Sequence, residues 1–394
     1  KNENKINLRF VRYSDPVNSV LRSVEIDRTW FESEICRAKN YDVWSCETLD
    51  TGSYKTEQII RSASFIEHKE PLKNFIHQSL VHVSYDLPYP VAGIMNRHYY
   101  GTGVLVDKNR GLIIVDRNTV PVAIGDIRLT FAGSLEVPGK VEYIHPLHNL
   151  ALLSFDPKLI GQTPIRAATF SSNELKAGDN SWLSGLKLDH QLFHQQITVA
   201  SVDPLNLPPS INFSDSNIEV IDLVSAPDDI YGVLTDKKGQ IEALWTSFSY
   251  RSGGESYQMN RGISSELINE FIDQFQAEKP LYSLELDLGY IPLFSARKLG
   301  LSDDWISQFE EQSKKRRVII VNNRLSGSSA AEMIQNGDLI LAIDGQLVTS
   351  FRDYEKYSQS REVTVTLWRQ NVIQEVIVSS ALLNGKNIDQ VIWQ

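Results

Sequence analysis

Cysteine is nearly absent from this chain of 394 residues, which contains only Cys36 and Cys46. Two cysteines ten positions apart cannot form the disulfide framework of a small secreted domain, so the sequence favours a reducing compartment, the cytosol or nucleus. No apolar run approaches the roughly 18 residues that a membrane-spanning helix needs. Basic residues are outnumbered, 39 Lys and Arg against 49 Asp and Glu, and the net charge of −10 argues against nucleic-acid binding. We therefore expect neither a membrane nor a nucleic-acid partner.

The remaining composition is that of an ordinary globular protein, with 42% apolar and 22% charged residues. The length predicts two or three domains with ample chain for a buried core. Residue 1 is a lysine, and a polar lead rather than a signal peptide precedes the first strand pattern. We therefore expect this sequence to be a piece of a longer protein.

The segment from Gly101 to Asp156 is rich in short strands. Two apolar runs, Val104–Val106 and Leu112–Val115, flank a polar turn that ends in glycine, which is the pattern of a β-hairpin. A further strand, Leu150–Phe155, follows a polar loop.

This order of strands resembles the first barrel of trypsin-like proteases of the HtrA/Deg family. In that family the segment opens with a G-[ST]-G strand, the catalytic His ends the next strand, and the catalytic Asp precedes an apolar strand. The resemblance puts Asn118 at the His position and Asn149 at the Asp position. Neither amide can take a proton from a nucleophile near neutral pH, or hold an imidazole in its basic tautomer as a carboxylate does.

The stretch Asn217–Trp245 resembles the family's second barrel, where a G-N-S-G-G loop carries the nucleophile. Matching Gly232 to the end of that motif puts Ile230 at the nucleophile and Asp228 at a glycine that directs backbone N–H groups to the oxyanion. Isoleucine has no nucleophilic atom, and a carboxylate repels an oxyanion. The resemblance thus implies a catalytically inactive domain, and we expect Pro227–Tyr231 to collapse into the former cleft with Ile230 partly buried.

The C-terminal part has the pattern of a different domain. Ser283–Leu288 alternates as a half-buried strand does, and Val318–Val321 and a short helix at Ala330–Ile334 follow. The run Asn336–Gly345 resembles the hallmark of an HtrA-type PDZ domain, and Phe351–Ser360 is then the helix that lines the peptide groove.

PDZ recognition uses consecutive backbone N–H groups of a loop, followed by an edge strand that pairs with the peptide. The candidate loop is Leu288–Leu293. The candidate peptide-binding residues are Leu288, Gly289, Tyr290, Ile291, Leu293, Phe351 and Tyr354. Because Pro292 has no N–H, we expect weak binding of free C-termini and a role in intramolecular docking.

An amphipathic segment follows the candidate loop. Ser302 is expected to cap it, and its apolar residues Trp305, Ile306 and Phe309 need a surface to cover. The sequence predicts that this surface is the PDZ groove or a neighbouring protease-like barrel.

The predicted fold is mostly β: a degenerate trypsin-like double β-barrel at residues 79–278 and an α+β PDZ domain at 281–394. A helix capped by Ser264 or Ser265 is expected to close the barrels. Residues 6–12 and 19–27 form a hairpin pattern, so residues 1–45 are interpreted as the last strands of a truncated PDZ domain, with a linker at 46–78. The alternative for the N-terminal segment is a β-arm that packs on the next domain.

This arrangement resembles the C-terminal half of the tandem HtrA-like proteases of fungi and plants, known in fungi as nuclear pro-apoptotic serine proteases. The resemblance implies that an intact triad lies in an upstream protease domain, which would be a partner of this chain. It also implies unfolded or peptide substrates, roles in protein quality control or apoptosis, and a place in the nucleus and cytoplasm. A homo-oligomer is left open.

Three further signals have ordinary explanations. Ser252-Gly253-Gly254 imitates a nucleophile motif but lies one strand too late, and a hairpin loop explains it better. His145 and His148 lack the cysteine or carboxylate cluster of a metal site, so no metal is expected, and no cofactor motif is complete. The basic run Lys314–Arg317 fits a nuclear-localisation element and a helix C-terminus equally well.

Three functions fit these patterns. The first is a non-catalytic regulatory and assembly half of a nuclear HtrA-like endopeptidase. The second is an active endopeptidase with an unrecognised nucleophile such as Ser225 or Ser252, and the third is a stand-alone peptide-binding adaptor. A fluorophosphonate probe, which labels only an activated serine, separates the second from the others.

Overall fold

The structure is a computed structural model that describes residues 5–11, 21–27, 34–39, 43–48, 60–87, 96–207, 217–252 and 255–383. The chain divides into two compact units. One contains Lys1–Arg61 and Ile388–Gln394, and the other contains Ser62–Asn387.

The first unit contains two antiparallel strand pairs. Strands β1 (Lys5–Val11) and β2 (Leu21–Asp27) form the predicted N-terminal hairpin, with Lys5 opposite Asp27. Strands β3 (Glu34–Lys39) and β4 (Val43–Thr48) form a second pair that the sequence did not predict. The assignment of residues 1–45 to a truncated PDZ domain stays a prediction.

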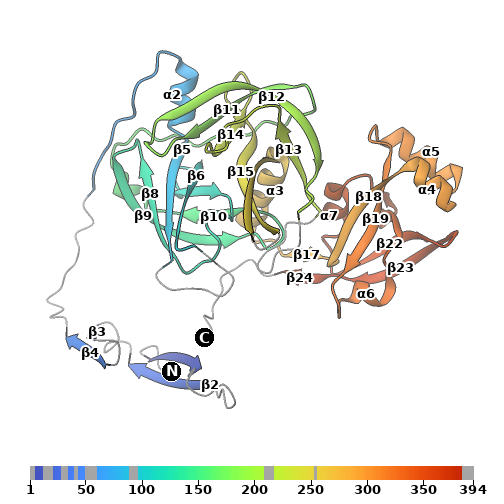
Figure 1. The fold of residues 1–394 in the computed structure, drawn as a ribbon, viewed down its shortest axis with the longest axis horizontal. Helices are drawn as coiled ribbons and strands as arrows, with labels where there is room; N and C mark the ends of the chain where they lie inside the picture. Colours follow the sequence, from blue (N-terminus) through green and yellow to red (C-terminus); the bar gives the residue numbers. More distant parts are fainter. Residues whose placement is uncertain are drawn as a thin grey trace. The chain divides into compact units, whose positions relative to one another are not determined.

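The second unit begins with a six-stranded closed barrel in the order β10-β7-β6-β5-β8-β9 (Figure 1). Its strands are β5 (Leu80–Asp86), β6 (His98–Asp107), β7 (Leu112–Val115), β8 (Asp126–Phe131), β9 (Leu135–Ile144) and β10 (Ala151–Ser154). A 3-10 helix, η1 (Pro157–Ile160), follows. Side chains alternate in direction along a strand, so each strand supplies one set of apolar residues to the barrel interior.

A second closed barrel follows, in the order β11-β12-β13-β16-β15-β14. Its strands are β11 (Asn180–Leu186), β12 (Leu192–Pro204), β13 (Glu219–Leu223), β14 (Gly232–Thr235), β15 (Ile241–Ser252) and β16 (Glu255–Ser264). The turn between β14 and β15 comes close to helix α2 (Pro71–His77), because a Cβ on Gly239 would lie 2.6 Å from Leu72.

The barrels share an apolar seam. Buried residues of the first barrel, such as Val104 and Leu152, belong to one cluster with Val233 and Leu244 of the second. Helix α3 (Ser265–Gln276) adds Phe271 and related residues to this seam. As predicted, Ser264 caps α3, since its side chain accepts a hydrogen bond from the Leu267 N–H.

Residues of the predicted linker pack on the first barrel. The Ala63 N–H donates to Thr163 Oγ1 (3.0 Å), and the Gln162 N–H donates to Ser62 Oγ (2.8 Å). Within the same stretch, Pro71–His77 is the helix α2, with proline in its first turn.

The C-terminal domain is built on a sheet in the order β18-β19-β20-β22-β23, so β18 and β23 are its edges (Figure 1). Its strands are β18 (Leu286–Pro292), β19 (Arg317–Arg324), β20 (Leu339–Ile343), β21 (Gln346–Leu347), β22 (Glu362–Arg369) and β23 (Val372–Ser379). Strands β17 (Leu281–Ser283) and β24 (Ala381–Leu383) pair with each other. The helices are α4 (Leu293–Leu299), α5 (Asp303–Gln312), α6 (Ser329–Met333) and α7 (Phe351–Tyr357).

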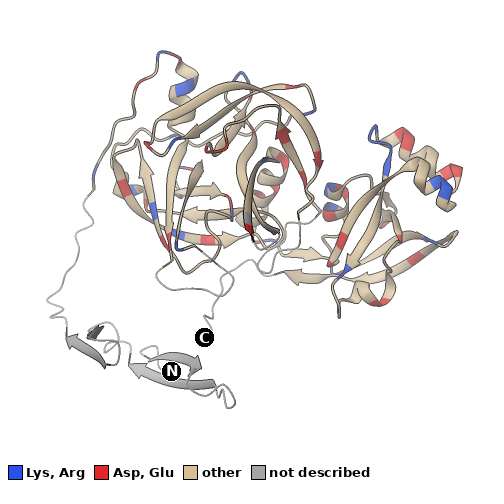
Figure 2. Cartoon of the chain, viewed as in Figure 1, with Lys and Arg blue, Asp and Glu red and all other residues tan. Residues whose placement is uncertain are grey.

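The two faces of this sheet are covered by different helices. Phe351 and Tyr354 of α7 join the apolar cluster on one face, and Ile306 and Phe309 of α5 join the cluster on the other. Figure 2 shows basic residues on α4 and acidic residues on α5. No helix of the described residues is long and apolar enough to cross a membrane.

Two expectations for this domain were wrong. Trp305, Ile306 and Phe309 cover neither the groove nor a barrel, because they pack with α4 and the sheet of their own domain. Ser302 precedes α5, but its side chain makes no capping hydrogen bond.

Buried histidines make the stability of this fold depend on pH. Burial, with a smaller contribution from His190, lowers the pKa of His82 to about 4. Because the unfolded chain takes up this proton at about pH 6.5, stability is complete above that pH and falls as the pH drops towards 4. We predict that His82→Gln flattens this dependence by roughly 1–3 kcal/mol, measured as urea midpoints at pH 7 and pH 4.5. The exposed His98 is the control: if His98→Gln flattens the curve equally, burial of His82 is not the cause.

Candidate functional site

The predicted triad residues Asn118 and Asn149 lie side by side. The Asn118 N–H donates to Asn149 Oδ1 at 3.0 Å, although 31 positions separate the two residues. Asn149 is buried, and Asn118 is half-buried. The fold therefore brings these two predicted positions together as the resemblance implied.

Ser247 joins the two amides, and sequence reasoning missed it. Asn118 Nδ2 donates to Ser247 Oγ at 2.6 Å, and Asn149 Nδ2 donates to the Ser247 carbonyl at 2.7 Å. Ser247 lies on β15 of the second barrel and is 4% exposed. The network thus crosses from one barrel to the other.

This network contains no general base. An Asn side chain is a neutral amide, and its NH₂ group can only donate. Asn118 donates its Nδ2 hydrogen to Ser247 Oγ and therefore does not accept the serine proton there. The amide groups are not basic near neutral pH, so no group in the network can remove that proton. A serine without such a partner is a weak nucleophile at neutral pH.

A buried acid lies two residues before Asn118. Asp116 is 2% exposed, and it accepts hydrogen bonds from Thr119 N–H (2.7 Å) and Thr119 Oγ1 (3.0 Å). Burial raises the pKa of Asp116 to about 6, against the opposing effect of the Thr119 hydrogen bonds. The hydrogen bonds of Asp116 hold the local turn together.

Ile230 lies in the core of the second barrel. It is 2% exposed and packs in a cluster with Leu183, Leu234 and Trp245. Ile230 is therefore buried, as expected. Because Asp228 and Asp229 are exposed, the collapse of the whole segment Pro227–Tyr231 into the former cleft stays a prediction. Asp228 is exposed, and its carbonyl accepts from Asn260 Nδ2 at 2.8 Å.

The alternative nucleophiles Ser225 and Ser252 both belong to the second barrel. Ser225 is exposed, and Ser252 ends β15, opposite Glu255 in the hairpin with β16. One Ser–His pair does occur, with Ser184 Oγ 2.8 Å from His194 Nδ1. Ser184 is fully buried, so a peptide bond cannot reach it.

His145 and His148 have the structural role that their sequence predicted. His145 Nδ1 accepts from the N–H groups of Leu147 and His148, and burial lowers the pKa of His145 well below its usual value. His148 Nε2 lies 2.8 Å from Glu355 Oε2 of helix α7. Among the described residues there is no group of three potential metal ligands.

The segment Leu288–Leu293, predicted to be a loop, is not one. Leu288–Pro292 belongs to the edge strand β18, and Leu293 begins helix α4. The prediction rested on the PDZ pattern of a loop followed by an edge strand, and this segment is the edge strand itself. Pro292 ends the strand and precedes the helix, a position where its missing N–H does no harm.

The candidate groove residues lie together nonetheless. The ring of Tyr290 stacks on Phe351 with 4.3 Å between centroids, and the Phe351 N–H donates to the Tyr290 hydroxyl. Leu288 and Tyr354 are buried in the same apolar cluster. Leu293 and Ile291 belong to the cluster on the other side of the sheet.

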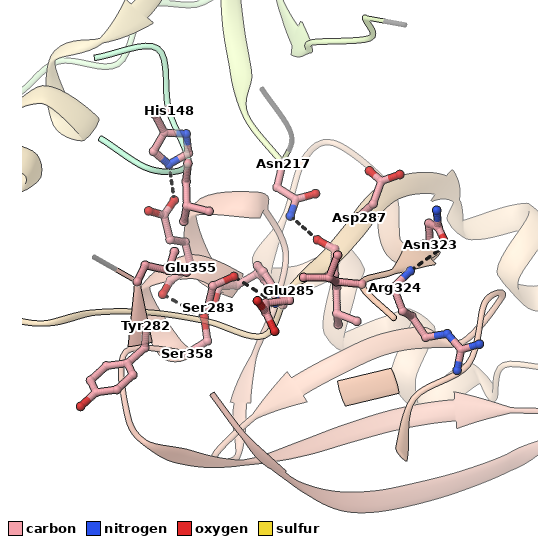
Figure 3. Close-up of a pocket in the computed structure, with 15 residues that line it drawn as sticks. His148, Asn217, Tyr282, Ser283, Glu285, Asp287, Asn323, Arg324, Glu355 and Ser358 are labelled. Carbon is pink, nitrogen blue, oxygen red and sulfur yellow. Dashed lines mark hydrogen bonds and ion pairs between the residues drawn. The ribbon is translucent and has the colours of Figure 1, made fainter. Parts of the chain in front are cut away.

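A cavity of about 370 Å³ lies at the start of β18 (Figure 3). The residues that line it come from the loop with His148, from Asn217, from β17 to β19 and from α7. Its acidic members are Glu285, Asp287 and Glu355.

Basic residues of the run Lys314–Arg317 form ion pairs with acidic residues. Lys315 and Arg317 both contact Glu219 at the start of β13, and Tyr290 donates to the same carboxylate (3.2 Å). Arg316 lies 2.8 Å from Glu310. The basic run therefore connects the C-terminal domain to the second barrel.

Comparison with known proteins finds relatives over most of the chain, whereas no family model matches. The chain is 27% identical over 394 residues to the pro-apoptotic serine protease NMA111 of Yarrowia lipolytica, covering 94% of this chain and 40% of that protein. It is 31% identical over 340 residues to Protease Do-like 7 of Arabidopsis thaliana, covering 76% of this chain and 31% of that protein. The chain thus spans less than half the length of these relatives.

Solved structures show the same fold. The HtrA-type protease AlgW with a tripeptide matches at a TM-score of 0.56 and 16% identity, over 79% of this chain and 96% of that chain. The serine endoprotease from Yersinia pestis matches at a TM-score of 0.50 and 15% identity, over 81% of this chain and all of that chain.

The two closed barrels and the following sheet domain define a trypsin-like double barrel with a PDZ domain. Its homologues over most of its length are NMA111 and Do-like proteases. The chain therefore belongs to the HtrA-type serine protease family.

The buried Asp116 generates a prediction. Its folded pKa of about 6 exceeds the unfolded value of 3.8, so the stability that it contributes is present below 3.8 and lost as the pH rises through 6. We predict that Asp116→Asn, which keeps an acceptor for the Thr119 N–H, raises the unfolding free energy by about 1–3 kcal/mol at pH 7. Chemical denaturation at pH 4 and pH 7 measures this difference. A loss of stability at pH 7 but not at pH 4 would contradict the prediction and show that the charged form is required.

The ion pairs of Glu355 lead to another testable prediction. Burial alone would raise its pKa, but His148 and Arg352 outweigh burial and hold the pKa at about 2. We predict that Glu355→Gln weakens the contact between α7 and the His148 loop by about 3 kcal/mol, because it leaves buried partners unpaired. Hydrogen exchange of both segments measures this change.

In the wild type, the same contact should weaken as the pH falls from about 4.5 towards 2, because the depressed pKa stabilises only the ionised form. Glu362→Gln, at an exposed position, is the control. Equal exchange in both variants would contradict the prediction.

Proposed function

We propose that this chain is a non-catalytic regulatory and assembly half of an HtrA-like serine endopeptidase. The observation that carries the proposal is the network of Asn118, Asn149 and Ser247, which has no ionisable group at neutral pH. Burial of Ile230 supports it, since the position matched to the nucleophile is part of a core.

The PDZ domain docks on the barrels in this proposal. His148 of the first barrel contacts Glu355, and Glu270 of α3 pairs with Arg352 of the same helix α7. The His148–Glu355 pair is buried, whereas Glu270 is exposed. A buried pair fixes orientation more than it adds stability, because desolvation offsets much of its attraction. We infer that the inactive barrels serve as a scaffold that holds the PDZ domain in one place.

The partners in this proposal are an upstream protease domain of the same protein and unfolded or peptide substrates. The chain spans 40% or less of the NMA111 and Do-like 7 relatives, which leaves room in those proteins for such a domain. The name pro-apoptotic serine protease, carried by several relatives, supports a role in proteolysis linked to apoptosis. We further propose the nucleus and cytoplasm as its location.

The second candidate is an active endopeptidase. The Ser184–His194 pair is the observation that favours it, but the complete burial of Ser184 counts against it. A stand-alone adaptor, the third candidate, predicts that the PDZ groove binds peptides without help from another domain.

We predict that the chain does not cleave casein or other unfolded proteins and is not labelled by a fluorophosphonate probe. The physical reason is that no base activates a serine in the neutral network. Gel assays and in-gel fluorescence measure this result.

The triple variant Asn118→His, Asn149→Asp and Ile230→Ser tests the same site by restoring the three triad residues. We expect it to stay inactive, because Asp228 remains where the oxyanion would form. Cleavage by the purified wild type that survives repurification would overturn the proposal. When Asp228→Gly is added to the triple variant, we expect partial cleavage of casein.

A further inference from the structure

Asn217 of the second barrel binds the edge of the PDZ sheet. Its Nδ2 donates to the Leu286 carbonyl at 2.7 Å (Figure 3). Its Oδ1 accepts from the Leu288 N–H at 2.8 Å. Leu286 and Leu288 lie on β18, which pairs with β19 on its other side. Both backbone groups are therefore those that an added strand would use.

A carboxamide presents the same groups as a peptide bond, one N–H donor and one C=O acceptor on the same carbon. By bonding residues i and i+2 of β18, Asn217 reproduces the two hydrogen bonds that one peptide residue makes with an edge strand. The side chain thus occupies the first pairing position of the groove.

The backbone at Asn217 favours this contact. Its φ is 54°, in the left-handed region where Asn is tolerated better than most residues. Two residues later, Glu219 binds Tyr290, Lys315 and Arg317 of the PDZ domain. Asn217 is therefore held against the strand by a neighbouring ion-pair network.

The cavity beside Asn217 has an unbalanced charge. Glu285 and Asp287 line it, and neither forms an ion pair among the described residues. Arg324 keeps its positive charge, because it donates only to Asn336 and to two carbonyls, which are neutral. The three carboxylates that line the cavity nevertheless outnumber it. A free C-terminal carboxylate would meet net negative charge here, whereas a Lys or Arg side chain would be attracted.

The cavity has room for a side chain. Its volume is about 370 Å³, and Asn217, Glu285 and Asp287 are among the residues that line it.

We propose that Asn217 is an internal substitute for a peptide, and that the β18 edge with its acidic cavity is a site for an extended internal segment carrying a Lys or Arg residue. This rests on the proposed docking role of the PDZ domain. The incoming segment takes the hydrogen bonds of Leu286 and Leu288 from Asn217, and its basic side chain enters the cavity beside Glu285 and Asp287.

The experiment measures binding of acetylated and amidated ten-residue peptides of alternating Val and Thr with one central Lys. The full chain is compared with Asn217→Gly, which removes the carboxamide and tolerates the positive φ. We expect about tenfold tighter binding by the variant, since two hydrogen bonds no longer compete. Fluorescence anisotropy gives Kd.

A matched control is Asn371→Gly, an exposed Asn with φ 66° in the β22–β23 turn. It should bind as the wild type does. A second peptide carries norleucine in place of Lys, and Asn217→Gly should bind the Lys peptide more tightly than this one. Adding Glu285→Gln and Asp287→Asn to Asn217→Gly should remove that difference. Hydrogen exchange of the Leu288 amide should rise in Asn217→Gly and fall again with the Lys peptide.

Equal Kd values for wild type and Asn217→Gly would overturn the proposal, and so would tighter binding of a peptide with a free carboxylate than of the amidated one. Neither result bears on catalysis, which the casein assay tests separately. Casein cleavage with the expected peptide affinities would overturn the proposed function and leave the Asn217 site in place.

Discussion

The apolar seam between the two barrels is the constraint on which the rest of the structure depends. Residues such as Val104 and Leu152 on one side and Val233 and Leu244 on the other belong to one buried cluster. Each fully buried side chain of this kind contributes about 1.5–3 kcal/mol, and none of them needs to be ionisable or reactive. The seam fixes where the loop with Asn118 and the strand with Ser247 meet, so the geometry of a catalytic cleft can persist after its chemistry is lost.

The amide network fits this separation of fold from chemistry. A His–Asp pair at these two positions would bring a buried charge with it. Two asparagines form hydrogen bonds in the same directions with neutral groups. The buried Asp116 shows the cost that charge has in this region, since burial raises its pKa. If the barrels are those of an inactive protease, as we propose, the side chains at the triad positions are ones that a buried contact between barrels tolerates.

The sequence predicted features that depend on local pattern or on one aligned position. The N-terminal hairpin, the Ser264 cap and the burial of Ile230 are of this kind. It misjudged Leu288–Pro292, because the PDZ pattern of a loop followed by an edge strand does not fix where the loop ends, and only pairing with β19 makes the segment a strand. Ser247, Asn217 and the partner of Glu355 were not predictable, because each contact joins residues 69 to 207 positions apart and no local pattern encodes it.

The contacts of the PDZ domain suggest why its surroundings are polar. An apolar interface of similar size would hold the domain permanently, whereas desolvated ion pairs nearly balance their own cost and give orientation with little net affinity. Glu219 of the second barrel pairs with Lys315 and Arg317 of the domain, and Glu355 of the domain pairs with His148 of the first barrel. Docking thus uses one carboxylate from each side of the contact. A contact of this strength can be replaced by a ligand that offers comparable hydrogen bonds, and Asn217 occupies the position where such an exchange would begin.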